Sequence, residues 1–140
     1  MDKNMESILT QIHLKMIRHN GNDPQRCQHT AKVHSYARLI GQMEELRDEM
    51  QFITEASAYL HDIGIRVAEE KYGEQNWELQ EQLGPDAARE ALAEFRLPED
   101  VVERICYIIG HHHTFAAIDG IDFRILAEAA YIVNAFEMGD

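Results

Sequence analysis

Residues 61–64 read His-Asp-Ile-Gly, and they place an imidazole beside a carboxylate at the end of an apolar stretch covering residues 52–60. One nitrogen and one oxygen ligand side by side suit a divalent cation. The pair alone is a weak signal, because a His-Asp dipeptide occurs by chance in many proteins. Further histidines strengthen it. His29 lies on an earlier apolar segment, and three consecutive histidines, residues 111–113, close a later one.

The helical period around these histidines predicts that they point inward. His29 shares a face with the apolar residues four, seven and eleven positions further on, and His112 shares one with the isoleucines of residues 105–109. His61 follows small or hydroxyl-bearing residues at 54, 57 and 58, which leave room for a cavity. Three inward histidines and Asp62, from three separate helices, therefore predict one site for manganese, iron, cobalt, nickel or zinc.

Each histidine also has a simpler explanation. A lone inward histidine is more often a hydrogen-bonded core residue than a ligand. The three consecutive histidines cannot all point inward, so at least one is expected to face solvent or a loop. His13, His19 and His34 belong to no shared cluster and receive no role. Cys27 is expected to be a packing residue, since it cannot share a helix face with His29 two positions later.

Composition narrows the class of protein. In 140 residues, 45% of them hydrophobic, there is enough apolar material for one domain with one core over residues 1–140. The formal charge of −12 argues against nucleic-acid and anionic-membrane partners, which attract basic proteins. Cys27 and Cys106 are far apart and read as reduced thiols. No apolar signal segment and no stretch of transmembrane length is visible, so we expect a soluble, cytoplasmic protein.

Apolar residues recur with helical period along nearly the whole chain, which predicts a compact all-α fold of six or seven helices. Asp23 and Pro24 form a strong helix start. Residues 65–83 are the least regular and are expected to hold a short helix near 67–70 and a solvated turn at 69–71 that runs into a loop at 71–73. Gly84 and Pro85 are expected to open a new helix. The predicted helices cover residues 5–19, 24–41, 47–62, 87–95, 101–110 and 122–137.

Three segments together, residues 25–33, 58–64 and 110–114, resemble the HD-domain superfamily of metal-dependent phosphohydrolases, and its small bacterial stand-alone members above all. Shorter segments at 71–73, 84–85, 118–120 and 125–129 extend the resemblance over nearly the whole chain. It implies a helical HD-type domain with a divalent metal ion: manganese, iron, cobalt, nickel, zinc or magnesium. It also implies that His29, His61 and Asp62 are metal ligands, with a distal aspartate as a further one.

The distal aspartate is missing. The family has it in a segment that resembles Leu-x-Glu-Ala-Asp, whereas residues 126–130 here end in Ala130. Glu128 lies about 160° away around a helix and is a poor substitute; His111 or His112 is a better candidate to complete the ligand shell. Three explanations are open: an engineered substitution, a natural site that keeps its metal through fewer ligands and water, or a natural loss of activity.

Phosphoester hydrolysis at such a metal also needs positive charge around the phosphoryl oxygens. Candidates are Arg26 and Lys32, one turn before and after His29, then Arg66 after the His-Asp pair, and Lys71. Many relatives carry a lysine directly after His-Asp-x-Gly, where this chain has Ile65, so one phosphate contact is lost.

Two histidines and Asp62 are the expected catalytic groups. Asp62 would bind the metal and orient or deprotonate the water, while His111 and His112 would donate to the leaving oxygen or bind a second metal. We expect a metal-dependent phosphohydrolase of a small phosphorylated metabolite or nucleotide.

Two alternatives remain. The first is a degenerate HD fold that binds a phosphorylated ligand or a protein partner without turnover, and the missing aspartate favours it. The second is a purely structural helical protein. The chain ends soon after the last predicted helix, where relatives often continue, so an uncovered helix face is also expected to favour homo-oligomers.

Overall fold

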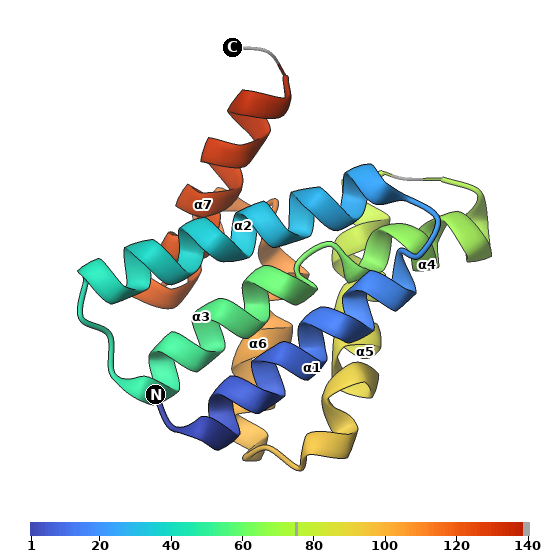
Figure 1. Ribbon diagram of the computed structural model, residues 1–140. Helices are drawn as coiled ribbons and strands as arrows, with labels where there is room; N and C mark the ends of the chain where they lie inside the picture. The colour runs from blue at the N-terminus through green and yellow to red at the C-terminus, as the bar shows by residue number, and fades with distance from the viewer. Residues whose placement is uncertain (75, 139–140) are drawn as a thin grey trace.

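The structure is a computed structural model that describes residues 1–74 and 76–138. These residues form seven α-helices and two short 3₁₀-helices, without a strand, which confirms the predicted all-α class (Figure 1). The elements, in chain order, are α1 (Lys3–His19), α2 (Pro24–Met43), α3 (Asp48–Leu60), α4 (Ile63–Tyr72), α5 (Trp77–Leu92), η1 (Ala93–Phe95), α6 (Glu99–His111), η2 (Phe115–Ala117) and α7 (Ile121–Glu137).

Helix α3 lies at the centre of the fold. Every residue from Gln51 to Leu60 is buried, because α3 packs against α1, α2, α6 and α7 on its different sides. Buried apolar side chains from all seven α-helices form one hydrophobic core. Because other helices cover α3, its C-terminal end is held in place. The His-Asp pair follows directly after that end.

Short polar residues cap three of the described helices, and the cap at Asp23 was predicted from the sequence. The side chain of Asp23 accepts a hydrogen bond from the Arg26 amide at 3.1 Å, and Asp2 and Asn76 cap α1 and α5 in the same way. Each cap satisfies an amide that the first helical turn leaves without a partner. At the other end of α4, Gly73 adopts a left-handed conformation, with φ of 69°, that stops the helix.

Most of the described residues in the region predicted to be irregular belong to two helices. Helix α4 covers Ile63–Tyr72. The helix predicted near residues 67–70 is therefore longer than expected, and Lys71 lies in this helix rather than in a turn or loop. Helix α5 runs through Pro85, so the helix start predicted at Gly84 and Pro85 is wrong.

Tertiary packing explains why α5 continues past its proline. An interior proline removes one helical hydrogen bond and costs about 3 kcal/mol in an isolated helix. Here α6 packs closely on that turn: Cys106 Sγ donates to the Pro85 carbonyl at 3.4 Å, and a Cβ atom added to Gly110 would lie 3.0 Å from Pro85 Cγ. These contacts hold the turn helical, and a sequence pattern contains no sign of them.

The turn that carries the His-Asp pair is pressed against α5. A Cβ atom added to Gly64 would lie 2.6 Å from the backbone oxygen of Gln80, closer than side chains tolerate. On the other side of the turn, His19 Nε2 donates to the Ile63 carbonyl at 3.1 Å. Helices α1 and α5 therefore hold the start of α4 from both sides.

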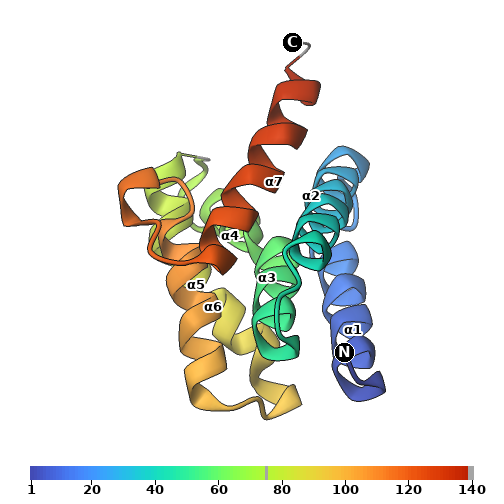
Figure 2. The ribbon, with the colours of Figure 1, turned by 90° about the vertical axis from the view of Figure 1, so that its left-hand side faces the viewer.

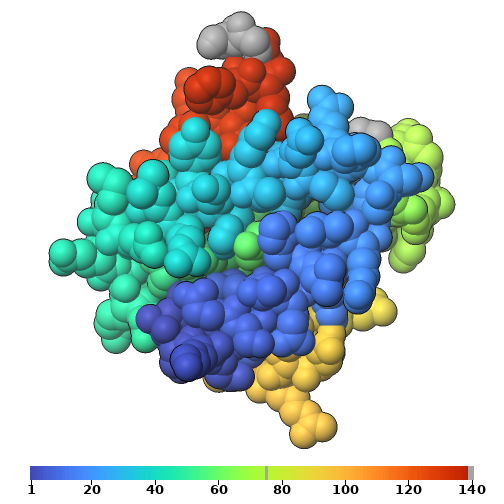
Figure 3. Space-filling model, viewed as in Figure 1, coloured from blue at the N-terminus to red at the C-terminus, as the bar shows by residue number. Residues whose placement is uncertain are grey.

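Helix α7 closes the fold and then extends beyond it. It packs along α2, and its last turns project from the rest of the molecule in both ribbon views (Figures 1 and 2). The space-filling view shows the same end standing above α2, with α1 below (Figure 3). Among the described residues, no helix combines the length and apolar character needed to cross a membrane.

We predict that Gly64→Ala lowers the free energy of unfolding by about 1–3 kcal/mol, because the new methyl group meets backbone that cannot move aside cheaply. Urea denaturation followed by circular dichroism measures the change. Gly73→Asn is the control, since asparagine tolerates a left-handed conformation and no atom lies within 4 Å of the added Cβ. Equal stability of Gly64→Ala and the parent would contradict the close packing of α4 on α5.

Candidate metal centre

His61 and Asp62 form the turn between α3 and α4, and both side chains are buried. Because α3 stops at Leu60 and α4 starts at Ile63, the two side chains leave the helical path and enter one cavity. His29 reaches the cavity from α2, and His112 reaches it from the position directly after the end of α6. The four residues predicted from three helices therefore do meet.

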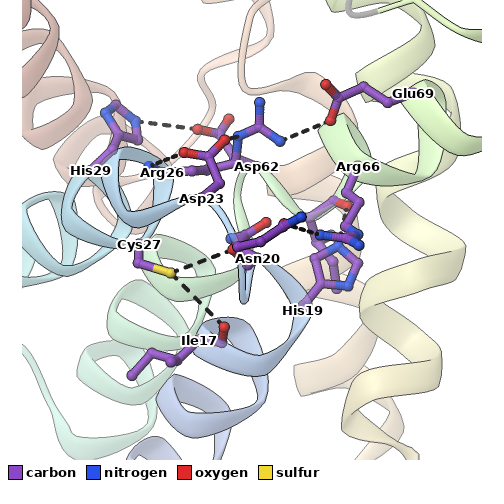
Figure 4. A network of polar contacts seen from close by, with 12 residues as sticks. Ile17, His19, Asn20, Asp23, Arg26, Cys27, His29, Asp62, Arg66 and Glu69 are labelled. Atoms are coloured by element: carbon purple, nitrogen blue, oxygen red, sulfur yellow. Dashed lines mark hydrogen bonds and ion pairs between the residues drawn. The ribbon is translucent and has the colours of Figure 1, made fainter.

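The carboxylate of Asp62 lies between the three imidazoles. Its Oδ2 atom is 3.2 Å from His29 Nε2 and 3.1 Å from His61 Nε2 (the His29 contact is drawn in Figure 4). Its Oδ1 atom is 3.5 Å from His112 Nε2. The ring centroids of His29 and His61 are 5.4 Å apart, and those of His61 and His112 are 5.5 Å apart. Asp62 thus contacts His29 and His61 through one oxygen and His112 through the other.

The far nitrogen of each ring is held by another group. His61 Nδ1 donates to the Ala58 carbonyl and His112 Nδ1 donates to the Ile109 carbonyl, each at 2.7 Å. His29 Nδ1 bonds to the Glu137 carboxylate at 2.8 Å. Such partners fix the tautomer that leaves the Nε2 lone pair available, as in metal-binding histidines.

This arrangement fits a divalent cation. The ligand atoms of His29, His61 and Asp62 all lie within 4.8 Å of one another, and so do those of Asp62, His112 and His113. His112 Nε2 is buried, has no hydrogen-bond partner, and belongs to a side chain that is 7% exposed. A buried nitrogen without a partner is costly in free energy, and a cation would satisfy it. Nitrogen and carboxylate ligands match the transition metals predicted from the sequence.

Electrostatics keep Asp62 ionised. Burial alone would raise its pKa, but the charge of His61 and the polar contacts with His112 and His29 hold the pKa well below its ordinary value. For His29 and His112, burial alone would lower the pKa, but the nearby carboxylates raise it, mainly Asp62 in both cases. Burial and the charge of His112 lower the pKa of His113 to about 4, so His113 is neutral at pH 7.

The three consecutive histidines take three different positions. His112 enters the cavity, and His113 lines its edge, where Nε2 contacts Gln80 Oε1 at 3.0 Å. His111 does not line the cavity: its ring stacks on Tyr107, with centroids 4.2 Å apart. His111 is therefore the one ring of the three that, as expected, points elsewhere. Its position does not support the cavity role predicted for it.

The predicted phosphate contacts are mostly displaced from the cavity. Arg26 lines it, while its guanidinium is bonded to Glu69 at 2.9 Å and lies 3.6 Å from Asp23 (Figure 4). Arg66 pairs with Glu70 and with Asn22 instead. Lys32 and Lys71 are exposed and do not line the cavity. Of these four cations, only Arg26 is in place to contact a ligand there.

The cavity has a volume of about 440 Å³, and α7 forms one wall of it. Ala130 lines that wall, so the position at which the family has an aspartate does face the site. Further along α7, Asn134 and Glu137 also line it, and Glu137 orients His29. Neither residue was predicted from the sequence. Their spacing from Ala130, four and seven positions, is the one local signal that places them on the same helix face.

The remaining histidines have structural contacts, in line with the absence of an assigned role. His13 and His34 stack on the two sides of Tyr59, with centroids 4.5 and 3.8 Å away. Cys27 packs where α1 meets α2, with Sγ 3.8 Å from the Asn20 carbonyl (Figure 4).

Comparison with known proteins agrees with the geometry. The family model described as HD domain matches residues 26–135, which is most of the chain and includes every residue of the histidine and aspartate cluster. Neither a curated protein nor a solved structure matches the chain.

The neighbouring residues His111 and His112 allow a matched test of the metal centre. We predict that His112→Ala weakens Co²⁺ binding by at least about tenfold, the lower end of the loss caused by removing even a supporting group of a ligand. His111→Ala, the control, should bind Co²⁺ like the parent. Quenching of Trp77, the one tryptophan, reports binding, since its ring centroid lies 6.3 Å from that of His113. Equal affinity of both variants would show that His112 is not a ligand.

Metal affinity should also depend on pH. Because the pKa values of His29 and His112 are raised above 6.5, both rings hold protons at a pH where ordinary histidines are largely neutral. A cation must displace these protons, so affinity should already decrease as pH falls from about 8 to about 6. Asp62 stays ionised over this range and adds nothing to the slope. Calorimetry in buffers of different ionisation enthalpy counts the released protons; a flat profile would contradict the raised pKa values.

Proposed function

This chain belongs to the HD-domain family, whose members are generally metal-dependent phosphohydrolases, and from that premise we propose that it hydrolyses a small phosphorylated metabolite or nucleotide. The observation that carries the proposal is the set of three Nε2 atoms around one buried carboxylate, each ring held in the orientation that a ligand needs. The proposal goes beyond family membership, because the family alone does not identify a substrate.

His29, His61 and Asp62 would hold the divalent cation, with His112 beside them. When bound, the cation would acidify a water molecule and draw charge from a phosphoryl oxygen. The imidazoles around Asp62 hold its pKa low, so the carboxylate would stay ionised, bind the cation and orient the water by accepting a hydrogen bond.

Two further groups act on the substrate in this proposal. His112, whose pKa is raised, can donate a proton to the leaving oxygen whenever it is not a ligand. Arg26 at the cavity edge would neutralise charge on the phosphoryl oxygens, although it shares its own charge with Glu69. Lys32 and Lys71 are exposed and lie outside the cavity, so we assign neither of them a contact with the phosphoryl oxygens.

Ala130 supports a second candidate function, a site that binds a phosphorylated ligand without turnover. With a methyl group at this position, the cavity wall lacks a carboxylate that could neutralise a bound cation. Looser positioning of a reacting group by about 1 Å can reduce the rate about a hundredfold. A degenerate HD fold would keep binding and lose hydrolysis.

We predict that Ala130→Asp binds Mn²⁺ more tightly than the parent and hydrolyses phosphomonoesters faster, because the carboxylate restores charge at a position that faces the site. Ala130→Asn is the matched control, equal in size but uncharged. Metal affinity by calorimetry and phosphate release by a colorimetric assay measure the two effects, with manganese, iron, cobalt, nickel and magnesium each tested.

The outcomes separate the candidates. Hydrolysis by the parent supports the phosphohydrolase, and hydrolysis by Ala130→Asp alone supports the degenerate fold. No hydrolysis by either form with any of these metals would contradict the proposal. Full activity of the parent without a gain in affinity from Ala130→Asp would assign completion of the site to His112.

A further inference from the structure

Two exposed aromatic side chains line the cavity that contains the metal centre. Phe115 on η2 is 69% exposed and Tyr131 on α7 is 72% exposed, and each belongs to the cavity wall. Exposed aromatic rings retain unburied apolar surface that a ligand can cover. Their concentration at one cavity, above a polar floor of histidines and Asp62, matches a ligand that is apolar at one end and charged at the other.

The charges of the wall limit how much negative charge the ligand carries. Among the described residues that line the cavity, Arg26 is the one lysine or arginine, and Glu69 and Asp23 already surround its guanidinium. Asp23, Asp62 and Glu137 line the same cavity. Phosphoryl chains require several cations around their oxygens. One arginine and one bound cation suit a single phosphoryl group.

We infer that the ligand is a phosphomonoester whose alcohol part carries a flat ring, with the phosphoryl group at the histidine floor and the ring against Phe115 and Tyr131. This inference rests on the proposed function for the position of the phosphoryl group. Gln25 and Asn134, which also line the cavity, offer donors and acceptors to the edge of a heterocycle. Sugar phosphates lack a flat aromatic ring that could lie against these side chains. Triphosphates carry more negative charge than one arginine and one cation can neutralise.

A panel of three phosphates tests the inference on the Mn²⁺-loaded protein: adenosine monophosphate, ribose 5-phosphate and adenosine triphosphate. Adenosine monophosphate should be preferred over ribose 5-phosphate by about five- to 150-fold in kcat/KM, the range that corresponds to stacking one base on an aromatic side chain. It should also be preferred over adenosine triphosphate, which carries the same base but more negative charge than the cavity neutralises. Phe115→Ala and Tyr131→Ala should reduce the preference over ribose 5-phosphate by raising KM for adenosine monophosphate more than KM for ribose 5-phosphate. Tyr131→Phe should retain it.

Tyr72→Ala is the control, because Tyr72 is also an exposed aromatic residue, 59% exposed, but does not line this cavity. Circular dichroism checks that each variant folds. Equal use of ribose 5-phosphate and adenosine monophosphate, preference for the triphosphate, or an equal loss on both monophosphates in the alanine variants would overturn the inference.

Binding measurements separate a failure of the proposed function from a failure of the inference about the ligand. If no phosphate is hydrolysed, the proposed function fails, and equilibrium binding of the same three compounds is measured by calorimetry instead. Preferential binding of adenosine monophosphate that depends on Phe115 and Tyr131 supports the inference without catalysis. Equal binding of the three compounds, or no binding of any, overturns it.

Discussion

The rest of this structure depends on one buried carboxylate, that of Asp62. An isolated ionised group is expensive to remove from water, so Asp62 can stay charged inside the fold only if partners surround it. The partners are imidazoles from α2, from the end of α3 and from the end of α6, and Oδ1 and Oδ2 face different rings. Those helices must therefore converge on one point, and the fully buried α3 fixes where that point lies.

Helix α7 forms the remaining side of the site and determines which side chains face it there. At position 130 it presents a methyl group, and seven residues later it presents Glu137 to the far nitrogen of His29. A carboxylate on that nitrogen makes the imidazole a more basic ligand. The negative charge that α7 contributes thus lies behind a candidate ligand, and position 130, which lines the cavity, contributes none.

A second polar cluster shows that histidine content alone says little about function. Glu55 is buried on α3, where His34 Nε2 lies 2.9 Å and Gln51 Nε2 lies 2.8 Å from its carboxylate. Burial alone would raise the pKa of Glu55, but these hydrogen bonds lower it. His34 also stacks on Tyr59. His34 is hydrogen-bonded to its neighbour Glu55, whereas His112 Nε2 forms no hydrogen bond and has only the Asp62 carboxylate 3.5 Å away. That difference separates a packed residue from a candidate ligand.

The sequence by itself determined the helical class, most helix positions, and the presence of a histidine and aspartate centre. Apolar period, capping residues and the His-Asp-Ile-Gly turn are local signals, and each needs only a few neighbouring residues. Tertiary structure alone decided the rest. Pro85 stays inside α5 because α6 packs on it, and the end of α6 at His111 determines which ring of the three enters the cavity. Glu137 meets His29 across 108 residues of chain, and contacts at that separation leave no local pattern to read.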